Sequence, residues 1–253
     1  MIFRSSMVAE AKRCVAKSHY RYSLGLIPKG KGENIDLFFG KALHKAIEIA
    51  LTSNLDQALA YLDGLLWPPS RNKSKRVATC LLRQFYHKFD MQFISAEEEF
   101  SFLVEEDEWK GRYDLIARKD GKTHVVELKT TNPYYLLTKP NDQFIAYQIG
   151  ASKDFGAEKF TLINLDPNEI DVTSIPIRFS QEDIDEWLNE FIIWKDYYKK
   201  CLSLGVYPKS SGACFDYNRK CEFHDICMSK FSMKQKIIDN CYDVDEEAKN
   251  LDW

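Results

Sequence analysis

The sequence predicts an α/β fold, with helices gathered near its beginning and strands after them. Apolar residues recur at helical spacing over residues 37–51, whereas residues 100–104, 113–117 and 124–128 are short aromatic or β-branched runs. Helix and strand patterns then alternate. The length of 253 residues suits one elaborated domain or two small ones, and the apolar content is ordinary for a globular protein.

Helical patterns account for most of the first third of the chain. We expect helices over residues 4–22, 37–51, 55–66 and 75–93. The tetrapeptide Trp67-Pro68-Pro69-Ser70 separates the third from the fourth, because proline has no backbone N–H to continue a helix. Further helices are predicted over 141–155 and 181–201, and a short amphipathic one after Phe231.

The strands predict a hairpin. Besides the three runs above, residues 160–165 and 172–177 have strand character. Lys119-Asp120-Gly121-Lys122 contains the Asp-Gly pair of a tight turn, so strands 113–117 and 124–128 should be antiparallel neighbours. The predicted organisation is a helical region over 1–95, a core over 96–204, a cysteine-bearing loop over 205–231, and a helix with an acidic tail over 232–253.

The sequence also predicts where in the cell the protein lies and what its cysteines do. No signal-peptide pattern opens the sequence and no apolar stretch is long enough to span a bilayer, so we expect a cytoplasmic protein without a membrane partner. An odd number of cysteines, seven, then favours thiols or metal ligands over disulfides.

The net charge of -3 does not by itself indicate a nucleic-acid binder, but one segment is basic. No acidic residue occurs from Pro69 to Phe89. A solvated helix face and a surface that follows DNA phosphates both explain this pattern. The candidate phosphate-binding residues are Arg71, Lys73, Lys75 and Arg76.

Two carboxylates and a lysine lie around the predicted hairpin. Asp114 precedes the turn, and Glu127 and Lys129 share one face of the strand after it. Clustered carboxylates repel unless a cation neutralises them, which favours a Mg²⁺ or Mn²⁺ site. Lysine beside such an ion can orient the attacking water and offset charge on phosphate. Alone, a Glu-x-Lys tripeptide is more often an ordinary exposed strand.

Two further motifs complete a family pattern. Gly40-Lys41-Ala42-Leu43-His44 lies in a predicted helix, and Gln143-Phe144-Ile145-Ala146-Tyr147 lies in a later one. In order, G-x-x-x-H, G-x-x-D, E-x-K and Q-x-x-x-Y resemble the signature of RecB-like PD-(D/E)XK nucleases. Tyr113 stands where the restriction-enzyme branch has proline.

The resemblance implies a central mixed sheet flanked by helices. It also implies that His44, Asp114, Glu127 and the Leu128 carbonyl hold Mg²⁺ or Mn²⁺, that Lys129 acts at the water, and that Gln143 and Tyr147 lie near the DNA backbone.

The cysteines extend the resemblance to the iron-sulfur subgroup of these nucleases, which includes AddB-type subunits and CRISPR-associated RecB-like exonucleases. Cys14 lies early in the chain, and Cys214, Cys221 and Cys227 lie late. The subgroup implies a [4Fe-4S] cluster on these four thiolates, with the late loop closing onto the first helix. Six residues separate Cys214 from Cys221, where the subgroup usually has two. Structural Zn²⁺ and unliganded thiols are the alternatives. Helical patterns assign packing roles to Cys80, Cys201 and Cys241.

We therefore expect a metal-dependent deoxyribonuclease, and by resemblance an exonuclease acting on single-stranded or duplex DNA ends. A sequence- or structure-specific endonuclease and a non-catalytic DNA-binding protein are the alternatives. Relatives of this size are encoded by phages, by CRISPR loci or in organelles, which implies a partner protein in recombination or replication.

Overall fold

The chain forms two compact units. Its computed structural model describes residues 1–30, 34–130, 141–157, 159–216 and 219–246. Unit 1 consists of Met1–Lys31, Ser101–Lys110 and Gln181–Trp253, and unit 2 consists of Gly32–Phe100 and Gly111–Ser180. The long strands β3 (Gln92–Val104) and β4 (Asp107–Lys119) contribute residues to both units.

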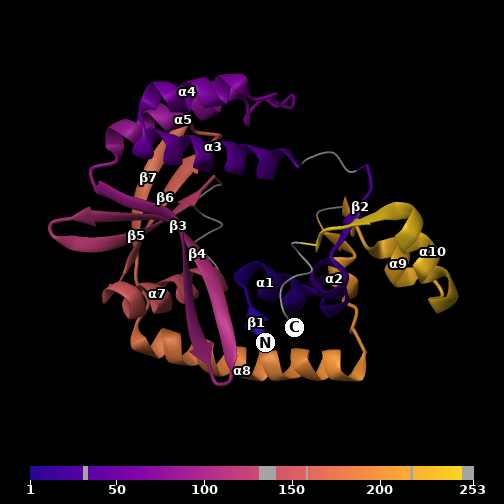
Figure 1. Ribbon diagram of the computed structural model, residues 1–253. Helices are drawn as coiled ribbons and strands as arrows, with labels where there is room; N and C mark the ends of the chain where they lie inside the picture. Colours follow the sequence, from indigo (N-terminus) through magenta and orange to yellow (C-terminus); the bar gives the residue numbers. More distant parts are fainter. Residues whose placement is uncertain (31–33, 131–140, 158, 217–218, 247–253) are drawn as a thin grey trace. The chain divides into compact units, whose positions relative to one another are not determined.

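Unit 2 is built on a mixed sheet (Figure 1). Strands β4, β5 (Lys122–Lys129), β6 (Phe160–Asp166) and β7 (Asp171–Ile177) are neighbours in that order, and β3 pairs with β4. Strands β5 and β6 are parallel, whereas β4 with β5 and β6 with β7 are antiparallel. The predicted α/β fold with a mixed sheet flanked by helices is confirmed.

The turn between β4 and β5 follows the Asp-Gly pair. Asp120 and Gly121 have φ angles of 51° and 73°, and the flanking residues Lys119 and Lys122 are paired. A two-residue turn with both φ angles positive matches the right-handed twist of the strands. The predicted hairpin is therefore confirmed.

Four helices of unit 2 begin at side chains that accept backbone N–H groups. Asn34 caps α3 (Ile35–Thr52) and Asn54 caps α4 (Leu55–Gly64). Ser74 caps α5 (Lys75–Lys88) and Asn141 caps α7 (Asp142–Phe155). Such caps satisfy N–H groups that have no partner inside the helix. Gly156 ends α7 in the left-handed conformation.

The two faces of the sheet have different roles. Helices α3, α4 and α5 pack together over one face, as Figure 1 shows, where they bury Val126, Leu128 and Ile163. Because side chains alternate along a strand, Glu127 and Lys129 point to the opposite face. Helix α7 packs on that face, where the ring of Phe144 meets the ring of Phe160.

The structure moves the predicted boundary between the fourth helix and the first strand. The helix predicted over 75–93 ends at Lys88, and β3 begins at Gln92, well before the predicted strand start at residue 100. Exposed and partly buried residues alternate from Gln92 to Ser95, which is a strand pattern at a half-covered edge. The glutamates that follow hid this continuity in the sequence.

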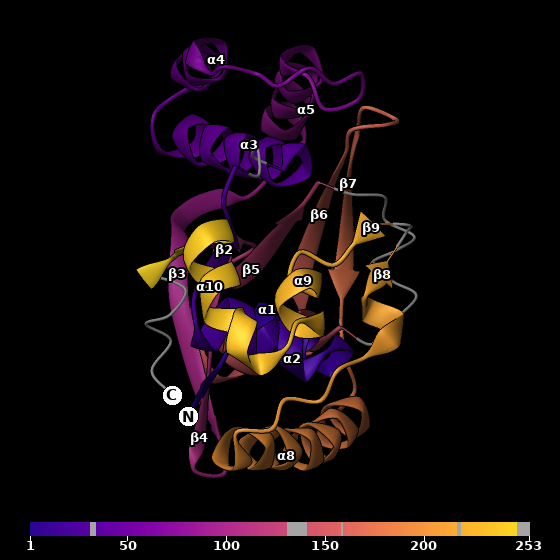
Figure 2. The same cartoon turned by 90° about the vertical axis from the view of Figure 1, so that its right-hand side faces the viewer.

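Apart from the long helix α8 (Gln181–Leu204), the elements of unit 1 are short (Figure 2). The helix predicted over 4–22 is divided into α1 (Ser5–Arg13), α2 (Val15–Ser18) and a π-helical turn (His19–Ser23). Cys14 interrupts it, because its backbone is extended with φ -163° and ψ 109°. The other elements of the unit are β1 (Ile2–Phe3), β2 (Leu26–Pro28), α8 (Gln181–Leu204), a 3-10 turn (Ser211–Ala213), β8 (Phe215–Asp216), β9 (Arg219–Lys220), α9 (His224–Met228), α10 (Phe231–Cys241) and β10 (Tyr242–Val244). Residues 247–253 of the predicted acidic tail lie outside the described residues.

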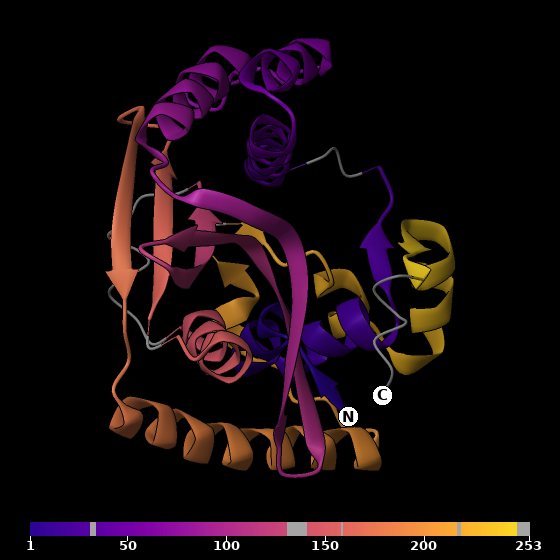
Figure 3. The same ribbon diagram turned by 60° about the vertical axis from the view of Figure 1, so that its left-hand side comes forward.

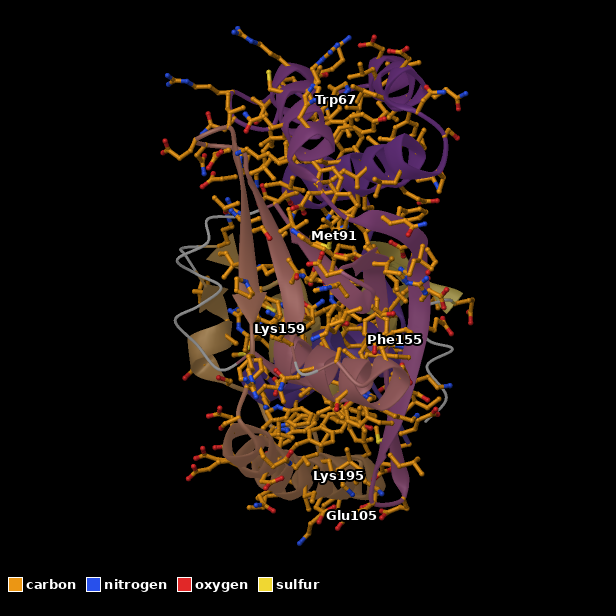
Figure 4. The ribbon with its side chains drawn as sticks, turned by 90° about the vertical axis from the view of Figure 1, so that its left-hand side faces the viewer. Trp67, Met91, Glu105, Phe155, Lys159 and Lys195 are labelled. Atoms are coloured by element: carbon orange, nitrogen blue, oxygen red, sulfur yellow. The ribbon has the colours of Figure 1, made fainter. Side chains whose placement is uncertain are left out.

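Within unit 1, the end of the β3–β4 hairpin packs on α8 (Figure 3). The fully buried Lys195 binds Asp107 at 2.9 Å and Glu105 at 2.7 Å (Figure 4). Burial would raise the pKa of Asp107, but hydrogen bonds from the amino terminus, Lys195 and Lys199 outweigh it and hold the pKa well below its usual range.

Among the described residues, no helix combines the length and the apolar character needed to cross a membrane.

Candidate functional site

The β4–β5 hairpin brings Asp114 beside Glu127 and Lys129, all within unit 2. The regular ladder runs from Lys119 paired with Lys122 to Leu115 paired with Val126. Just beyond it, the backbone N–H of Leu128, two residues after Val126, donates to Oδ2 of Asp114, one residue before Leu115, at 2.7 Å. The carboxyl groups of Asp114 and Glu127 are close enough to hydrogen-bond when one is protonated. The site is therefore built where the ladder ends.

Glu127 is the most buried carboxylate of the site, with 1% of its surface exposed. Its Oε1 accepts from Gln143 Nε2 at 2.9 Å and forms an ion pair with Lys129. Its Oε2 is buried and accepts no hydrogen bond within the described residues. Burial, with the charge of Asp114, raises the pKa of Glu127 to about 7. A buried carboxylate with one vacant oxygen is poised to receive a cation.

His44 reaches the same place from α3. Its Nδ1 lies 3.8 Å from Asp114 Oδ1, and the Leu128 carbonyl accepts a hydrogen bond from the imidazole. Burial lowers the pKa of His44, so its ring is neutral and keeps a lone pair for a metal. One turn earlier, a Cβ on Gly40 would lie 3.3 Å from Thr130 Oγ1. The glycine of G-x-x-x-H therefore permits a close approach of α3 to the end of β5.

Helix α7 supplies Gln143 and Tyr147 from one face. Gln143 Oε1 accepts from Lys129 Nζ at 3.0 Å, and Gln143 Nε2 also donates to Tyr147 Oη at 3.3 Å. The Tyr147 hydroxyl donates to the Arg112 carbonyl. Gln143 thus holds both the glutamate and the lysine, and Tyr147 fixes Gln143 to β4.

An aromatic cluster supports the site, and sequence reasoning missed it. Phe100 stacks on Tyr113 with ring centroids 4.3 Å apart and meets Tyr147 edge to face. A Cβ on Gly111 would lie 2.3 Å from Phe100 Cζ, and one on Gly150 would lie 2.5 Å from Phe100 Cδ2. The glycine of G-x-x-D therefore makes room for a ring. Its presence three residues before Asp114 was the available signal.

The donor set suits a hard divalent cation. As arranged, no three His, Cys, Asp or Glu side chains in the described parts of the chain converge closely enough to hold a metal ion. Two adjoining carboxyl groups, a neutral imidazole and the vacant Glu127 Oε2 nevertheless match the oxygen-rich ligands that Mg²⁺ and Mn²⁺ prefer. Lys129 already pairs with Oε1, so a cation would approach Oε2.

Three of the four candidate cluster cysteines share an apolar cluster in unit 1. Cys14 and Cys227 are buried in it and Cys221 packs against it. The Cys221 N–H donates to the Cys214 carbonyl at 2.8 Å, which places the fourth cysteine alongside. Burial raises the pKa of the Cys221 and Cys227 thiols. All four sulfurs are free thiols, and they do not form a metal-holding group.

The other cysteines differ from one another. Cys201 is buried on α8 and Cys80 is partly buried on α5, as packing residues are. Cys241 is exposed at the end of α10, so the packing role predicted for it is wrong.

The basic segment divides into paired and unpaired side chains. Lys73 Nζ lies 2.5 Å from Asp36 Oδ1, and Lys75 Nζ lies 3.2 Å from Asp63 Oδ1. Arg71 and Arg76 are exposed, and within the described residues neither has an ion-pair partner. Of the four candidate residues, only Arg71 and Arg76 could therefore meet phosphate without first breaking an ion pair seen among the described residues.

Comparisons with known proteins agree with this geometry. The model of the PD-(D/E)XK nuclease superfamily matches residues 5–228. A candidate exonuclease from Eubacterium rectale has a similar structure, with a TM-score of 0.52, 13% identity, and coverage of 92% of this chain and 91% of that one. The protein SSO0001 is 18% identical over 76% of this chain and 75% of that one, with a TM-score of 0.37. The first likeness shows a shared fold. No curated protein matches the chain.

Proposed function

We propose that this chain, which belongs to the PD-(D/E)XK nuclease superfamily, is a metal-dependent deoxyribonuclease that trims DNA from its ends. The observation that carries the proposal is the buried Glu127, which adjoins Asp114, has an unpartnered Oε2 among the described residues and binds Lys129 through Oε1. A structural ion pair would not require a second carboxyl group at the same place.

The residues of the site have separable roles. His44, Asp114, Glu127 and the Leu128 carbonyl would hold Mg²⁺ or Mn²⁺. When bound, such an ion polarises phosphate and lowers the pKa of a water molecule. Lys129, held by Gln143 at 3.0 Å, orients the attacking water and offsets negative charge on the phosphorus oxygens. Gln143 fixes that lysine and would lie near the DNA backbone, whereas Tyr147, which is buried, acts by fixing Gln143.

Substrate binding rests on charge outside the site. Arg71 and Arg76 are exposed guanidinium groups suited to bidentate phosphate contacts, whereas Lys73 and Lys75 contribute less because acids already neutralise them. The similar fold of a candidate exonuclease favours end trimming over internal cutting by analogy.

For unit 1 we propose a [4Fe-4S] cluster on Cys14, Cys214, Cys221 and Cys227, in a cytoplasmic protein. The support is the shared apolar cluster around Cys14 and Cys227, with Cys221 against it. Zn²⁺ on the same sulfurs is the alternative.

Cleavage of a linear single-stranded fragment, a linear duplex and a closed single-stranded circle tests the proposal. With Mg²⁺ or Mn²⁺ we expect both or one of the linear substrates to shorten and the circle to persist. With EDTA, cleavage should stop. Digestion of the circle would indicate an endonuclease, and no cleavage with any divalent ion would indicate a DNA-binding protein.

A metal titration tests the ligand assignment. His44→Ala should need more Mn²⁺ for half-maximal cleavage while melting near the wild-type temperature, because the imidazole donates to the metal and not to the core. A variant that unfolds and is not rescued by excess Mn²⁺ would show instead that His44 is a core residue.

A further inference from the structure

A buried asparagine lies next to the lysine of the site. In the parallel pairing of β5 with β6, Lys129 is paired with Asn164 and Glu127 with Leu162. Residues paired in this way project to the same face of a sheet. Asn164 therefore lies on the face that carries Glu127 and Lys129, whereas its neighbours Ile163 and Leu165 pack under α3, α4 and α5.

Packing alone does not explain the asparagine. Only 1% of its surface is exposed, and its Oδ1 is buried without a hydrogen-bond partner in the part of the chain that the structure describes. A buried unsatisfied acceptor destabilises a fold. The next two residues toward the start of β6 on this face are Leu162 and Phe160, both fully buried. An apolar side chain at position 164 would continue their pattern without that cost.

Lys129 has a hydrogen-bond donor that is not used. An ammonium group carries three N–H donors. Within the described residues, the Lys129 Nζ meets two acceptors, Gln143 Oε1 at 3.0 Å and Glu127 Oε1. Among the described residues, one N–H of the Lys129 ammonium group and the Oδ1 of Asn164, the paired residue on β6, therefore each lack a partner.

We propose that Asn164 is a positioning residue for Lys129, whose ammonium group it holds by accepting a hydrogen bond at Oδ1. The inference rests on the proposed nuclease function. In this structure the ammonium group pairs with Glu127 Oε1, which carries the opposite charge.

Glu127 is also a proposed metal ligand, and a cation held there would weaken its attraction for Lys129. Gln143 Oε1 from α7 and Asn164 Oδ1 from β6 would then be the neutral acceptors left for the ammonium group. Between these two acceptors the ammonium group would keep its full positive charge for the water and the phosphate, because neither Gln143 nor Asn164 carries a charge that would cancel it.

The test compares turnover with stability. Asn164→Leu keeps the branched shape and removes the acceptor, and Asn164→Ala removes it without added bulk. Thr161→Val is the matched control, because Thr161 is a buried polar residue of β6 on the opposite face. We expect either Asn164 variant to lower kcat about tenfold with KM for DNA unchanged, since hydrogen bonds to charged groups have about that effect. Thr161→Val should leave kcat unchanged.

Two further readouts separate positioning from structure. In EDTA, Asn164→Leu should melt at or above the wild-type temperature, because it removes an unsatisfied polar atom. In a Lys129→Ala background, Asn164→Ala should cause no further loss of kcat, because the group that it positions is gone.

Three results would overturn the inference: unchanged kcat in both Asn164 variants, a loss that multiplies with that of Lys129→Ala, or a lowered melting temperature that accounts for the lost activity. These outcomes presuppose that the wild type cleaves DNA. Failure of the wild type to cleave with any divalent ion would remove the proposed function itself, and with it the role of Lys129.

Discussion

The backbone N–H of Leu128 donates a hydrogen bond of 2.7 Å to Oδ2 of Asp114. This contact lies just beyond the last regular pair of the hairpin, Leu115 with Val126, one residue along β4 and two along β5. One carboxyl oxygen of Asp114 is thereby tied to the strand that carries Glu127 and Lys129. The spacing between the two carboxylates is consequently set by the backbone of the hairpin, so that a cation meets a preorganised pair.

Asparagine at position 114 separates chemistry from structure. Asp114→Asn keeps an oxygen for the Leu128 N–H but removes the charge, so we expect wild-type melting and a loss of cleavage of about a hundredfold or more. Asp114→Ala should lose cleavage equally and also lower the free energy of unfolding by about 1 to 3 kcal/mol, because it leaves that N–H unpaired.

Glu127→Ala and Lys129→Ala should lose cleavage to a similar degree, and Lys122→Ala, at the exposed start of β5, is their control. Cleavage at the wild-type rate by Glu127→Ala would falsify the assignment of the site. Rates with Mg²⁺ and thermal melting in EDTA are the measurements.

The raised pKa of Glu127 predicts how the metal-free protein responds to pH. The folded protein binds this proton up to about pH 7, whereas the unfolded chain releases it near 4.5. Between these values the folded state holds more protons, so its stability falls as pH rises and then levels off. Glu127→Gln should thus be more stable than wild type by roughly 3 kcal/mol at pH 8 and equal to it at pH 4.

Chemical denaturation in EDTA at the two pH values measures this difference. Lys122→Gln serves as a control, since it alters an exposed charge on the same strand. Equal stability of Glu127→Gln and wild type at pH 8 would mean that the charged carboxylate is not disfavoured by the fold.

Local patterns predicted the hairpin that builds the site. Asp120 and Gly121 require positive φ angles, and from that turn the position of Asp114 near Glu127 follows by counting along two strands. The spacing of Gln143 and Tyr147 likewise needs only the period of a helix. These relationships depend on residues close together in the chain.

Long-range relationships were not predictable in this way. Asn164 is visible in the sequence as a polar residue in an apolar strand, but its neighbour Lys129 is set by a crossover pairing of distant strands. Phe100 fills space left by Gly111 and Gly150, which no periodicity connects. The break at Cys14 was hidden because the residues around it keep a helical pattern.

The ring of Phe100 makes Gly111 intolerant of a side chain. Gly111→Ala places a methyl group 2.3 Å from Phe100 Cζ, so either the ring or β4 must move. We expect the free energy of unfolding to fall by about 1 to 3 kcal/mol. Cleavage should fall as well, because Phe100 packs on Tyr113 and Tyr147. Denaturant titration and initial rates measure the two effects.

Gly64→Ala is the control for this substitution, since no atom lies within 4 Å of a Cβ built there. Combining Gly111→Ala with Phe100→Leu should restore part of the lost stability, because leucine is smaller than the phenylalanine ring that blocks a Cβ at position 111. A double variant as unstable as the sum of the two single ones would show that the ring is not the obstacle.

The ion pairs of the basic segment predict an unequal response to salt. Each phosphate contact releases counterions, so DNA affinity should fall with added salt. Replacing Arg71 and Arg76 by alanine should flatten that dependence, because both are exposed without an ion-pair partner among the described residues. Replacing Lys73 and Lys75, which pair with Asp36 and Asp63, should change it less.

Fluorescence anisotropy with labelled DNA in Ca²⁺, at several salt concentrations, gives the two slopes. The arginine and the lysine double variants carry the same change in net charge, so a difference between their slopes reports where the charge lies and not how much charge is lost. Equal slopes in wild type and the arginine variant would identify the segment as a solvated helix face.

The last prediction concerns Cys14, which precedes the other three candidate cluster cysteines by two hundred residues or more. A cluster shared by Cys14, Cys214, Cys221 and Cys227 would close that loop and remove chain entropy from the unfolded state worth roughly 5 kcal/mol. Protein purified without oxygen should be brown and contain about four irons per chain. Cys14→Ala should bleach it and lower the melting temperature sharply. Cys80→Ala should do neither, because Cys80 lies on α5 in unit 2. Zinc in place of iron would establish a structural zinc site, and neither metal, with the two variants alike, would leave four unliganded thiols in an apolar cluster.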